Sequence, residues 1–232
     1  MRRFFFRSVL CATVLTAVIE VLSPSAEACG NVVSLSKNVA SQLVARAEKA
    51  LSQGKPAEAF DILDEKLRSH YGLRTEDPTL TRKLQLIYSV ACIRSSDAKG
   101  MEYGTRSLKW AHESDPKNPI VAARLAEAIS RLPAETPEKA EQNRKEALAL
   151  LEPLAEKDLI VDADAFATLA RLKKQKGDDG GAKEALARCA KMSKNPTVCS
   201  DAPWPSPAPD GTRTPSALRT RRFHPMDSGI DL

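Results

Sequence analysis

Apolar residues recur at intervals of three and four positions through most of the region from residue 37 to 196. Such spacing places one side chain per turn on the same side of a helix, whereas a half-buried strand alternates at every second position. The pattern divides into eight stripes, and each stripe predicts one helix. The stripes cover residues 43–51, 59–67, 80–91, 101–111, 121–132, 147–154, 166–170 and 182–192.

Residues that start and stop helices stand between these stripes. Three stripes are preceded by a capping residue followed directly by proline, namely Asp77-Pro78, Asn118-Pro119 and Thr136-Pro137. The capping oxygen accepts from free backbone N–H groups, and proline at the first helical position removes no donor that the helix needs. Gly54 and Gly177 stand where a helix ends with a left-handed residue. Asp162 and Asp179 are further expected caps.

The composition favours helices independently of the pattern. Hydrophobic residues make up 42% of the 232 residues, but only 5% are aromatic, because alanine and leucine dominate the apolar share. These residues lose little freedom in helices, whereas strands favour β-branched and aromatic residues. We therefore predict an all-α fold. The formal charge is +5, but charges of both signs are interspersed, so no basic face for nucleic acid is expected.

The first 28 residues are typical of a cleavable secretory signal. A basic start with Arg2 and Arg3 precedes a short apolar run over residues 8–19, and Ala26-Glu27-Ala28 offers small residues for signal peptidase. The run is too short for a comfortable membrane span. We predict an exported protein, periplasmic or secreted, in which an N-terminal segment over residues 29–36 precedes the helical domain.

Two details of this region leave alternatives open. Arg2-Arg3-Phe4-Phe5 resembles a twin-arginine export signal, although an ordinary basic start has the same form. Cys29 directly follows Ala28 and resembles the acylated first residue of bacterial lipoproteins. Ala26 and Glu27 depart from the residues that lipoproteins prefer there. Contact with a membrane is expected only if Cys29 is lipidated, which would anchor the protein in the outer membrane.

Four cysteines remain after the predicted cleavage: Cys29, Cys92, Cys189 and Cys199. An oxidising compartment permits disulfides, and a bond between Cys189 and Cys199 would fix the end of the last helix. The alternative is that Cys92 and Cys189 are small buried core residues.

The stripes form four pairs that are similar to one another. Ala47, Gly54, Ala59 and Leu63 match Ala170, Gly177, Ala182 and Leu186 at identical spacings, and residues 115–119 read like a repeat ending. In these residues the chain resembles tetratricopeptide repeats, over roughly residues 39–195. The usual tyrosine of each repeat is missing, and the second and third units are spaced wider than 34 residues. The resemblance implies an α-solenoid of about four helical hairpins over residues 37–196.

The residues after this region have a different character. Residues 197–232 are rich in proline, serine and threonine, and prolines alternate at positions 203, 205, 207 and 209. A segment without an apolar period cannot bury enough surface to offset its ordering entropy. We predict a disordered, Pro-rich C-terminal tail.

No catalytic or metal-binding pattern is visible in the sequence. The three histidines, His70, His112 and His224, have no further ligand at metal-binding spacing on their own helices. There is no G-x-S-x-G elbow and no phosphate-binding glycine loop. Residues 177–181 lack the oxygen ligands of a calcium loop and are interpreted as a tight turn between helices. We expect no enzyme activity, no metal and no cofactor.

The resemblance also implies a binding surface. In tetratricopeptide arrays the first helix of each hairpin lines a concave groove that holds a peptide or protein segment. By position, the groove residues here would be Glu48, Ser52, Ser89, Ile93, Glu127, Arg131, Arg171 and Lys174. One end of the groove would be acidic and the other basic, and arginine there could hold carboxylates on a ligand.

Three functions are compatible with these features. The leading hypothesis is an exported adaptor that binds a peptide or an envelope protein through the groove. The alternative is a structural envelope lipoprotein anchored through Cys29. A third is a thiol-dependent redox protein that uses Cys92 or Cys189.

Overall fold

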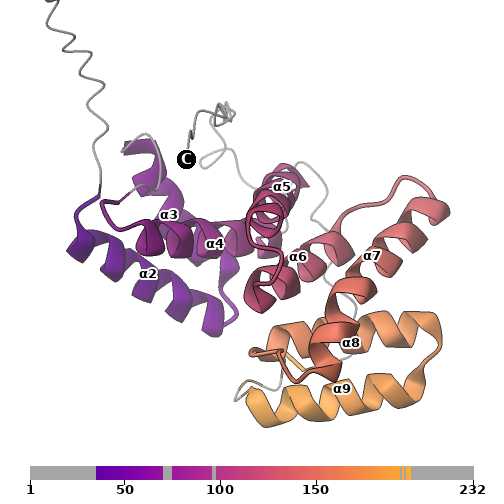
Figure 1. The fold of residues 1–232 in the computed structure, drawn as a ribbon. Helices are drawn as coiled ribbons and strands as arrows, with labels where there is room; N and C mark the ends of the chain where they lie inside the picture. The colour runs from indigo at the N-terminus through magenta and orange to yellow at the C-terminus, as the bar shows by residue number, and fades with distance from the viewer. Residues whose placement is uncertain (1–34, 70–74, 96–97, 194, 196, 200–232) are drawn as a thin grey trace, which may run out of the picture. The chain divides into compact units, whose positions relative to one another are not determined.

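The computed structural model describes residues 35–69, 75–95, 98–193, 195 and 197–199, all within one compact unit, Ser34–Leu232. These residues form eight α-helices and, apart from an isolated bridge between Leu35 and Thr75, no β-structure (Figure 1). The predicted all-α class is therefore confirmed. The helices are α2 (Lys37–Ser52), α3 (Pro56–Ser69), α4 (Pro78–Arg94), α5 (Ala98–Ser114), α6 (Pro119–Arg131), α7 (Pro137–Glu156), α8 (Ala163–Lys176) and α9 (Asp179–Met192).

The expected capping residues begin most of these helices. The side chains of Asp77, Asn118 and Thr136 accept hydrogen bonds from the first backbone N–H groups of α4, α6 and α7, and proline is the first residue of each helix. Asp162 caps α8 in the same way, accepting from Ala165 N at 2.8 Å. These side chains satisfy donors that a helix start would otherwise leave unpaired.

The turn between α8 and α9 corrects one predicted cap. Asp178, not Asp179, caps α9, because its carboxylate accepts from Gly181 N at 2.8 Å. Gly177 ends α8 in the left-handed conformation, with φ of 87°, and Gly54 follows α2 with φ of 71°. The turn between the two helices is therefore limited to Gly177 and Asp178, and residues 179–181, which were predicted to belong to it, form the first turn of α9.

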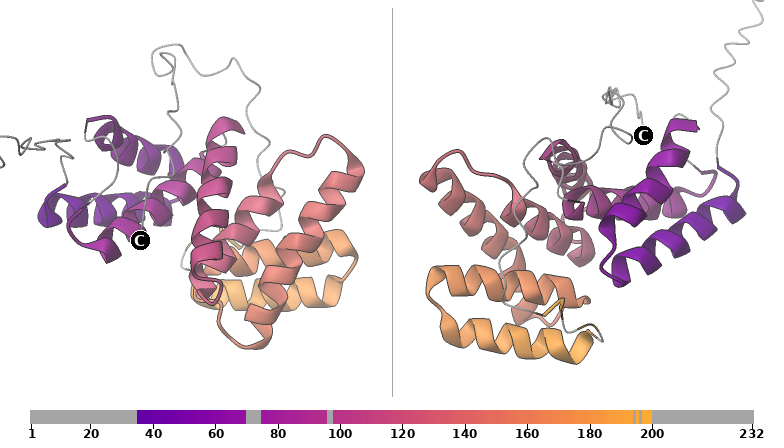
Figure 2. Two further views of the ribbon diagram at one scale, coloured as in Figure 1. Left: turned by 45° about the horizontal axis from the view of Figure 1, so that its top comes forward. Right: turned by 180° about the vertical axis from the view of Figure 1, so that it is seen from behind.

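Consecutive helices pair into hairpins. The four helix pairs with the most extensive contacts are α2–α3, α4–α5, α6–α7 and α8–α9, and the views in Figures 1 and 2 show the last pair lying side by side. The first helix of each hairpin also contacts the first helix of the next, so that α2, α4, α6 and α8 form a row. We call these four helices the A-helix row.

The second hairpin shows why a small residue is needed where its helices meet. Gly104 of α5 packs against α4, where a Cβ atom would lie 2.7 Å from Ser89 O and 2.8 Å from the Cγ1 atom of Ile93. The Ser89 backbone and the buried Ile93 side chain would both have to shift to make room for this Cβ atom, at a substantial cost in free energy. Only glycine therefore allows this close approach of α5 to α4.

The buried apolar side chains form two separate clusters. The N-terminal core joins α2, α3 and α4 and includes Leu43, Leu63 and Leu84. The C-terminal core joins α6, α7, α8 and α9 and also receives Ile93 from α4 and Leu108 from α5. Helix α4 thus contributes to both clusters, and the boundary between them lies at the second hairpin.

Several expectations fall on parts of the chain that the structure does not describe. These are the signal sequence over residues 1–28, Cys29, and the tail from residue 200 onward. The expected start of the tail at residue 197 is corrected, because residues 197–199 form a turn. None of the helices in the described residues is long and apolar enough to span a membrane.

Candidate partner-binding face

The side chains expected to line a groove along the A-helix row differ in exposure. The exposed ones are Glu48, Ser52 and Lys174, Arg171 is half-buried, and the side chain of Arg131 is only 10% exposed. The buried ones are Ser89, Ile93 and Glu127, with exposed fractions of 1%, 2% and 2%. The last three cannot touch a ligand directly in this structure. The expected groove is therefore corrected to the other five residues.

Two of the buried side chains are used in packing within the second hairpin. Ser89 Oγ donates to Gln85 O at 2.9 Å and is hydrogen-bonded to Ser107 Oγ of α5 at 3.0 Å. Ile93 belongs to the C-terminal core and lies against Gly104. The periodicity placed both residues on the correct helix, but it could not show that α5 and α6 cover them.

The third buried side chain, Glu127, is the centre of an ion-pair network that joins three helices of the A-helix row. Arg94, the last residue of α4, donates from Nε and NH2 to the two carboxylate oxygens of Glu127 on α6, both at 2.8 Å. The same guanidinium lies 3.0 Å from Asp164 on α8. The side chains of Arg94 and Glu127 are only 11% and 3% exposed. Bidentate contacts of this kind, with two parallel hydrogen bonds, are the strong form of the arginine–carboxylate interaction.

Two more arginines of α6 complete the network. Arg124 lies 3.2 Å from Glu127, 3.4 Å from Asp162 and 3.8 Å from Asp164. Arg131 lies 3.1 Å from Glu127, one helical turn further along α6. The N-cap of α8 is thus bound to α6, and a single glutamate interacts with three arginines.

The charged groups of this network shift the pKa values of one another. Burial alone would raise the pKa of Glu127, but Arg94, Arg131 and Arg124 outweigh it and hold this pKa well below the usual range of glutamate. Burial, together with the nearby Arg94 and Arg171, lowers the pKa of Arg131 to about 10, although Glu127 acts in the opposite direction. At neutral pH the Glu127 carboxylate and the guanidinium of Arg131 are therefore both charged.

The network and its surroundings carry more positive than negative charge. Arg171 acts on Arg131 electrostatically, and Lys174 follows Arg171 one turn later on α8. Together with Arg94 and Arg124 these residues make five cationic groups on the A-helix row. Opposite them stand three carboxylates, those of Glu127, Asp162 and Asp164. These eight side chains therefore carry a net charge of +2.

The other end of the row is different. Glu48 of α2 pairs with Lys83 of α4 at 3.0 Å, and their side chains are 47% and 49% exposed. Water competes with an exposed pair of this kind, and the two charges cancel. The acidic end expected from Glu48 alone is therefore close to neutral.

Sequence reasoning missed Arg94, Arg124 and Asp164 as members of the site. Arg94 and Glu127 are separated by 33 positions, so no local pattern links them. A partial signal was available, because Glu127 follows Arg124 by three positions and precedes Arg131 by four, so the three residues must share one side of a helix.

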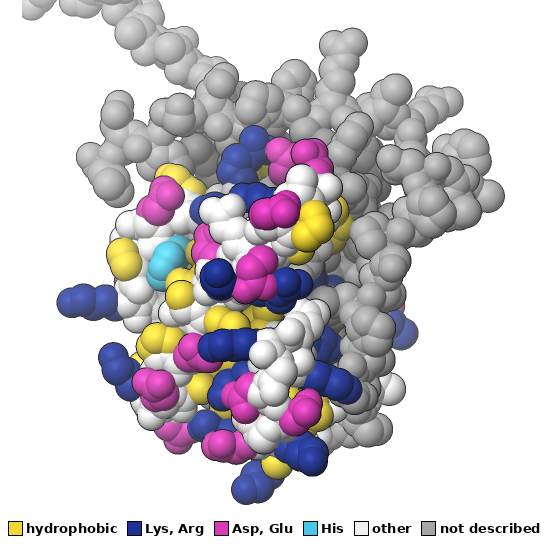
Figure 3. Space-filling model, turned by 90° about the vertical axis from the view of Figure 1, so that its right-hand side faces the viewer, with side chains coloured by type: hydrophobic (Ala, Val, Ile, Leu, Met, Phe, Trp, Pro, Cys, Tyr) yellow, Lys and Arg dark blue, Asp and Glu magenta, His cyan; other side chains and the backbone are white. Residues whose placement is uncertain are grey.

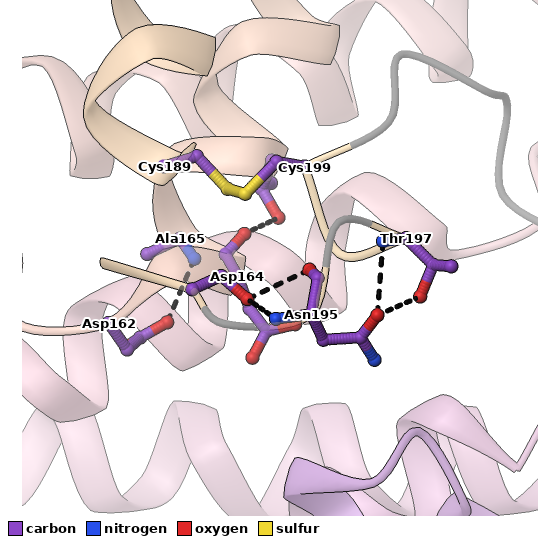
Figure 4. The surroundings of a disulfide bond; sticks show 9 residues. Asp162, Asp164, Ala165, Cys189, Asn195, Thr197 and Cys199 are labelled. Carbon is purple, nitrogen blue, oxygen red and sulfur yellow. Dashed lines mark hydrogen bonds between the residues drawn. A yellow bond between two sulfur atoms is a disulfide. The ribbon is translucent and has the colours of Figure 1, made fainter. Parts of the chain in front are cut away.

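A disulfide connects the last helix to the segment that follows it. Cys189 of α9 is bonded to Cys199, ten positions later, and their Cα atoms lie 5.7 Å apart. Figure 4 shows the bond close to the start of α8, where Asp162 caps the helix. The turn between the two cysteines is braced by Asn195, whose side-chain oxygen accepts from Thr197 N and Oγ1. The sequence left open whether Cys189 forms a disulfide or is a small buried core residue, and in the structure it forms the disulfide.

Cys92 is a buried thiol in the N-terminal core, with an exposed fraction of 0%. It lies next to Tyr88, whose pKa is raised by burial and by the nearby Cys92 and Asp64. Tyr88 also stacks on Phe60 and donates to Asp64 at 3.2 Å. These surroundings are those of a small buried core residue, which is the alternative that the sequence offered for Cys92.

Outside the A-helix row, the described surface has charges of both signs side by side. In the face shown in Figure 3, lysine and arginine side chains alternate with aspartate and glutamate. A shallow cavity of about 320 Å³ lies between α7, α8 and α9, where the Arg188 guanidinium lies 4.4 Å from the centre of the Phe166 ring. Among the residues that the structure describes, no three histidine, cysteine or acidic side chains are grouped so as to hold a metal ion.

The fold and this site define an all-helical protein made of consecutive hairpins with a buried charge network in its A-helix row. No protein-family model matches the chain, and no similar protein was found among curated proteins or solved structures.

Proposed function

We propose that this protein is an exported adaptor with a tetratricopeptide-like solenoid that binds an acidic peptide or protein segment along its A-helix row. The observation that carries the proposal is the excess of cationic side chains at the α6–α8 end of the row. Arginine offers a forked set of donors to carboxylates, and opposite charge speeds association and selects the partner.

In this proposal the buried charged groups hold the helices together, and the more exposed ones contact the bound segment. Arg94 and Glu127 are buried and hold α4, α6 and α8 together. Arg171 and Lys174 lie on the next helix, half-buried and exposed respectively, where a bound segment would reach them. Positioned cations on a rigid helix recognise a ligand with less loss of side-chain freedom than flexible surface lysines.

Export is supported by the signal-like pattern of residues 1–28 and by the disulfide between Cys189 and Cys199. Disulfides form in the periplasm or outside the cell and are rare in reducing cytosol. Mass spectrometry of the mature N-terminus tests this part of the proposal. A chain that begins near Cys29 supports it, whereas a chain that still begins at Met1 contradicts it. An acylated Cys29 would instead show the lipoprotein alternative.

The binding proposal is tested with two labelled peptide pools of equal length, one rich in aspartate and glutamate and one rich in lysine and arginine. We expect fluorescence anisotropy to show binding of the acidic pool only, weakening as salt is raised. Lys174→Glu should reduce the affinity about tenfold, because it replaces an attraction worth roughly 1 kcal/mol by a repulsion.

Lys191→Glu provides the matched control. Lys191 is an exposed lysine in the last turn of α9, outside the A-helix row, and its replacement makes the same change in net charge. Equal weakening by both variants would show that only net charge matters and would contradict a site on the row. Absence of binding to the acidic pool would contradict the proposal as a whole.

A further inference from the structure

The N-terminal and C-terminal cores meet along a seam between α4–α5 and α6. The buried apolar side chains that reach across this seam from α4 and α5 are Ile93 and Leu108, with exposed fractions of 2% and 1%. Either core by itself is held by many more apolar side chains. Few fully buried apolar side chains of α4 and α5 therefore hold the seam closed.

One end of the seam is a short, braced turn over residues 115–118. Asn118 N donates to Asp115 O at 3.1 Å, and the side chains of the same two residues are hydrogen-bonded at 3.2 Å. Pro116 lies inside the turn and Pro119 directly follows it, so two of the backbone φ angles are restricted. This turn keeps α5 and α6 close together at one end.

The other end of the seam is held by Arg94. Glu127 lies nine positions after Asn118, which is about 14 Å along α6. There Arg94 reaches from α4 to Glu127 at 2.8 Å and to Asp164 of α8 at 3.0 Å. Among described residues, one further ion pair crosses the seam, between Lys109 and Glu146. It is weak, because its side chains are 47% and 43% exposed and 3.7 Å apart.

We propose that residues 115–118 are a hinge and that Arg94, with Glu127 and Asp164, is the latch that holds the two cores against each other. Breaking the latch removes two short, charge-assisted hydrogen bonds and one ion pair at the end of the seam opposite the hinge. Each core keeps the apolar contacts that do not cross the seam. The cores then move as rigid bodies, and the spacing between α4 and α6 in the A-helix row changes. This inference does not depend on the proposed partner.

The test measures the distance between spin labels placed on the two cores. Nitroxides are attached at Arg46→Cys on α2 and Lys183→Cys on α9, two exposed positions. Cys11 and Cys29 are replaced by serine in all variants, Cys92 is buried and Cys189 is in a disulfide with Cys199, so the introduced thiols react selectively. Double electron–electron resonance should give one narrow distance distribution in the otherwise unchanged protein. We expect Arg94→Met to broaden it and to shift its mean.

Two controls make the outcome specific. A label pair within the C-terminal core, Ala149→Cys with Lys183→Cys, should keep its distribution in the Arg94→Met background. Arg144→Met removes an arginine–glutamate pair within α7 and should leave the distance between the cores unchanged. If Arg94→Met prevents folding, Arg94→Lys is used, because it keeps the charge and loses the forked contact. An unchanged distribution between the cores in a folded Arg94 variant would overturn the proposal, as would equal broadening of both label pairs.

Discussion

The two cores of this protein are built from the same kinds of helices, but they are supported differently. The N-terminal core relies on apolar packing, and its A helices are joined by the exposed pair of Glu48 and Lys83. The C-terminal core has in addition a buried network around Glu127 and a disulfide from Cys189 to Cys199. Both regions contain ion pairs between a basic residue and a glutamate. The two pairs are expected to contribute different free energies to stability, because water competes strongly with the exposed pair and weakly with the buried one.

The largest expected effect is that of Glu127→Gln. This change leaves Arg94, Arg124 and Arg131 close together without their shared carboxylate. Removing one partner from a buried ion pair costs about 3–5 kcal/mol. We expect a loss of this size in the free energy of unfolding, measured by urea denaturation followed by circular dichroism. A loss below about 1 kcal/mol would mean that water reaches the network.

The same glutamate predicts a specific pH dependence. Its pKa is lowered in the folded protein, so its contribution to stability is complete above the unfolded pKa of about 4.3 and is lost as pH falls towards the folded value. Unfolding measured between roughly pH 5 and pH 2 should show a steeper loss of stability in the unchanged protein than in Glu127→Gln. Parallel curves for the two proteins would exclude this role.

The disulfide should have the next largest effect. Cys199→Ser opens a loop of ten positions, and loss of a native disulfide costs about 2–4 kcal/mol. Hydrogen exchange should then become faster at the C-terminal end of α9, while α2 and α3 keep their protection. Faster exchange spread evenly over both cores would show that the disulfide stabilises the whole chain and would remove one difference between the cores.

A smaller effect is expected from the caps of α8 and α9. Asp162 caps α8 and also lies 3.4 Å from Arg124, whereas Asp178 caps α9 from a more exposed position beside Lys173. Loss of a cap costs about 1 kcal/mol. Asp162→Ala should therefore lower the melting temperature more than Asp178→Ala. The reverse order would indicate that the contact with Arg124 adds nothing.

The smallest effect is expected at the other end of the A-helix row. Glu48→Gln removes an exposed pair with Lys83, and exposed pairs contribute about 0.2–1 kcal/mol. The free energy of unfolding should change by no more than this, and the change should disappear at high salt. A cost comparable with that of Glu127→Gln would contradict the comparison between the cores.

The sequence predicted what depends on local chemistry. The eight helices, the caps at Asp77, Asn118, Thr136 and Asp162, and the left-handed residues Gly54 and Gly177 follow from spacing and residue type. The cap of α9 was misplaced by one position, because Asp178 and Asp179 are adjacent and both can accept a hydrogen bond. The turn over residues 197–199 was missed because a disulfide, rather than an apolar stripe, holds it in place.

The candidate site was predicted only in part, because it depends on contacts between distant residues. Arg131, Arg171 and Lys174 could be placed by position along the first helices of the hairpins. The pairing of Arg94 with Glu127 could not, since these residues lie on helices of different hairpins. Burial of Ser89 and Ile93 depends on the close approach that Gly104 allows, which is a property of the packed hairpin.

A double-mutant cycle of Arg94→Met and Glu127→Gln tests most directly whether the buried network joins the two cores. A parallel cycle of Lys83→Met and Glu48→Gln provides the comparison, and both use free energies of unfolding in urea. We expect a coupling energy above about 1.5 kcal/mol for the buried pair and below about 0.5 kcal/mol for the exposed pair. Equal, small couplings in the two cycles would contradict the account.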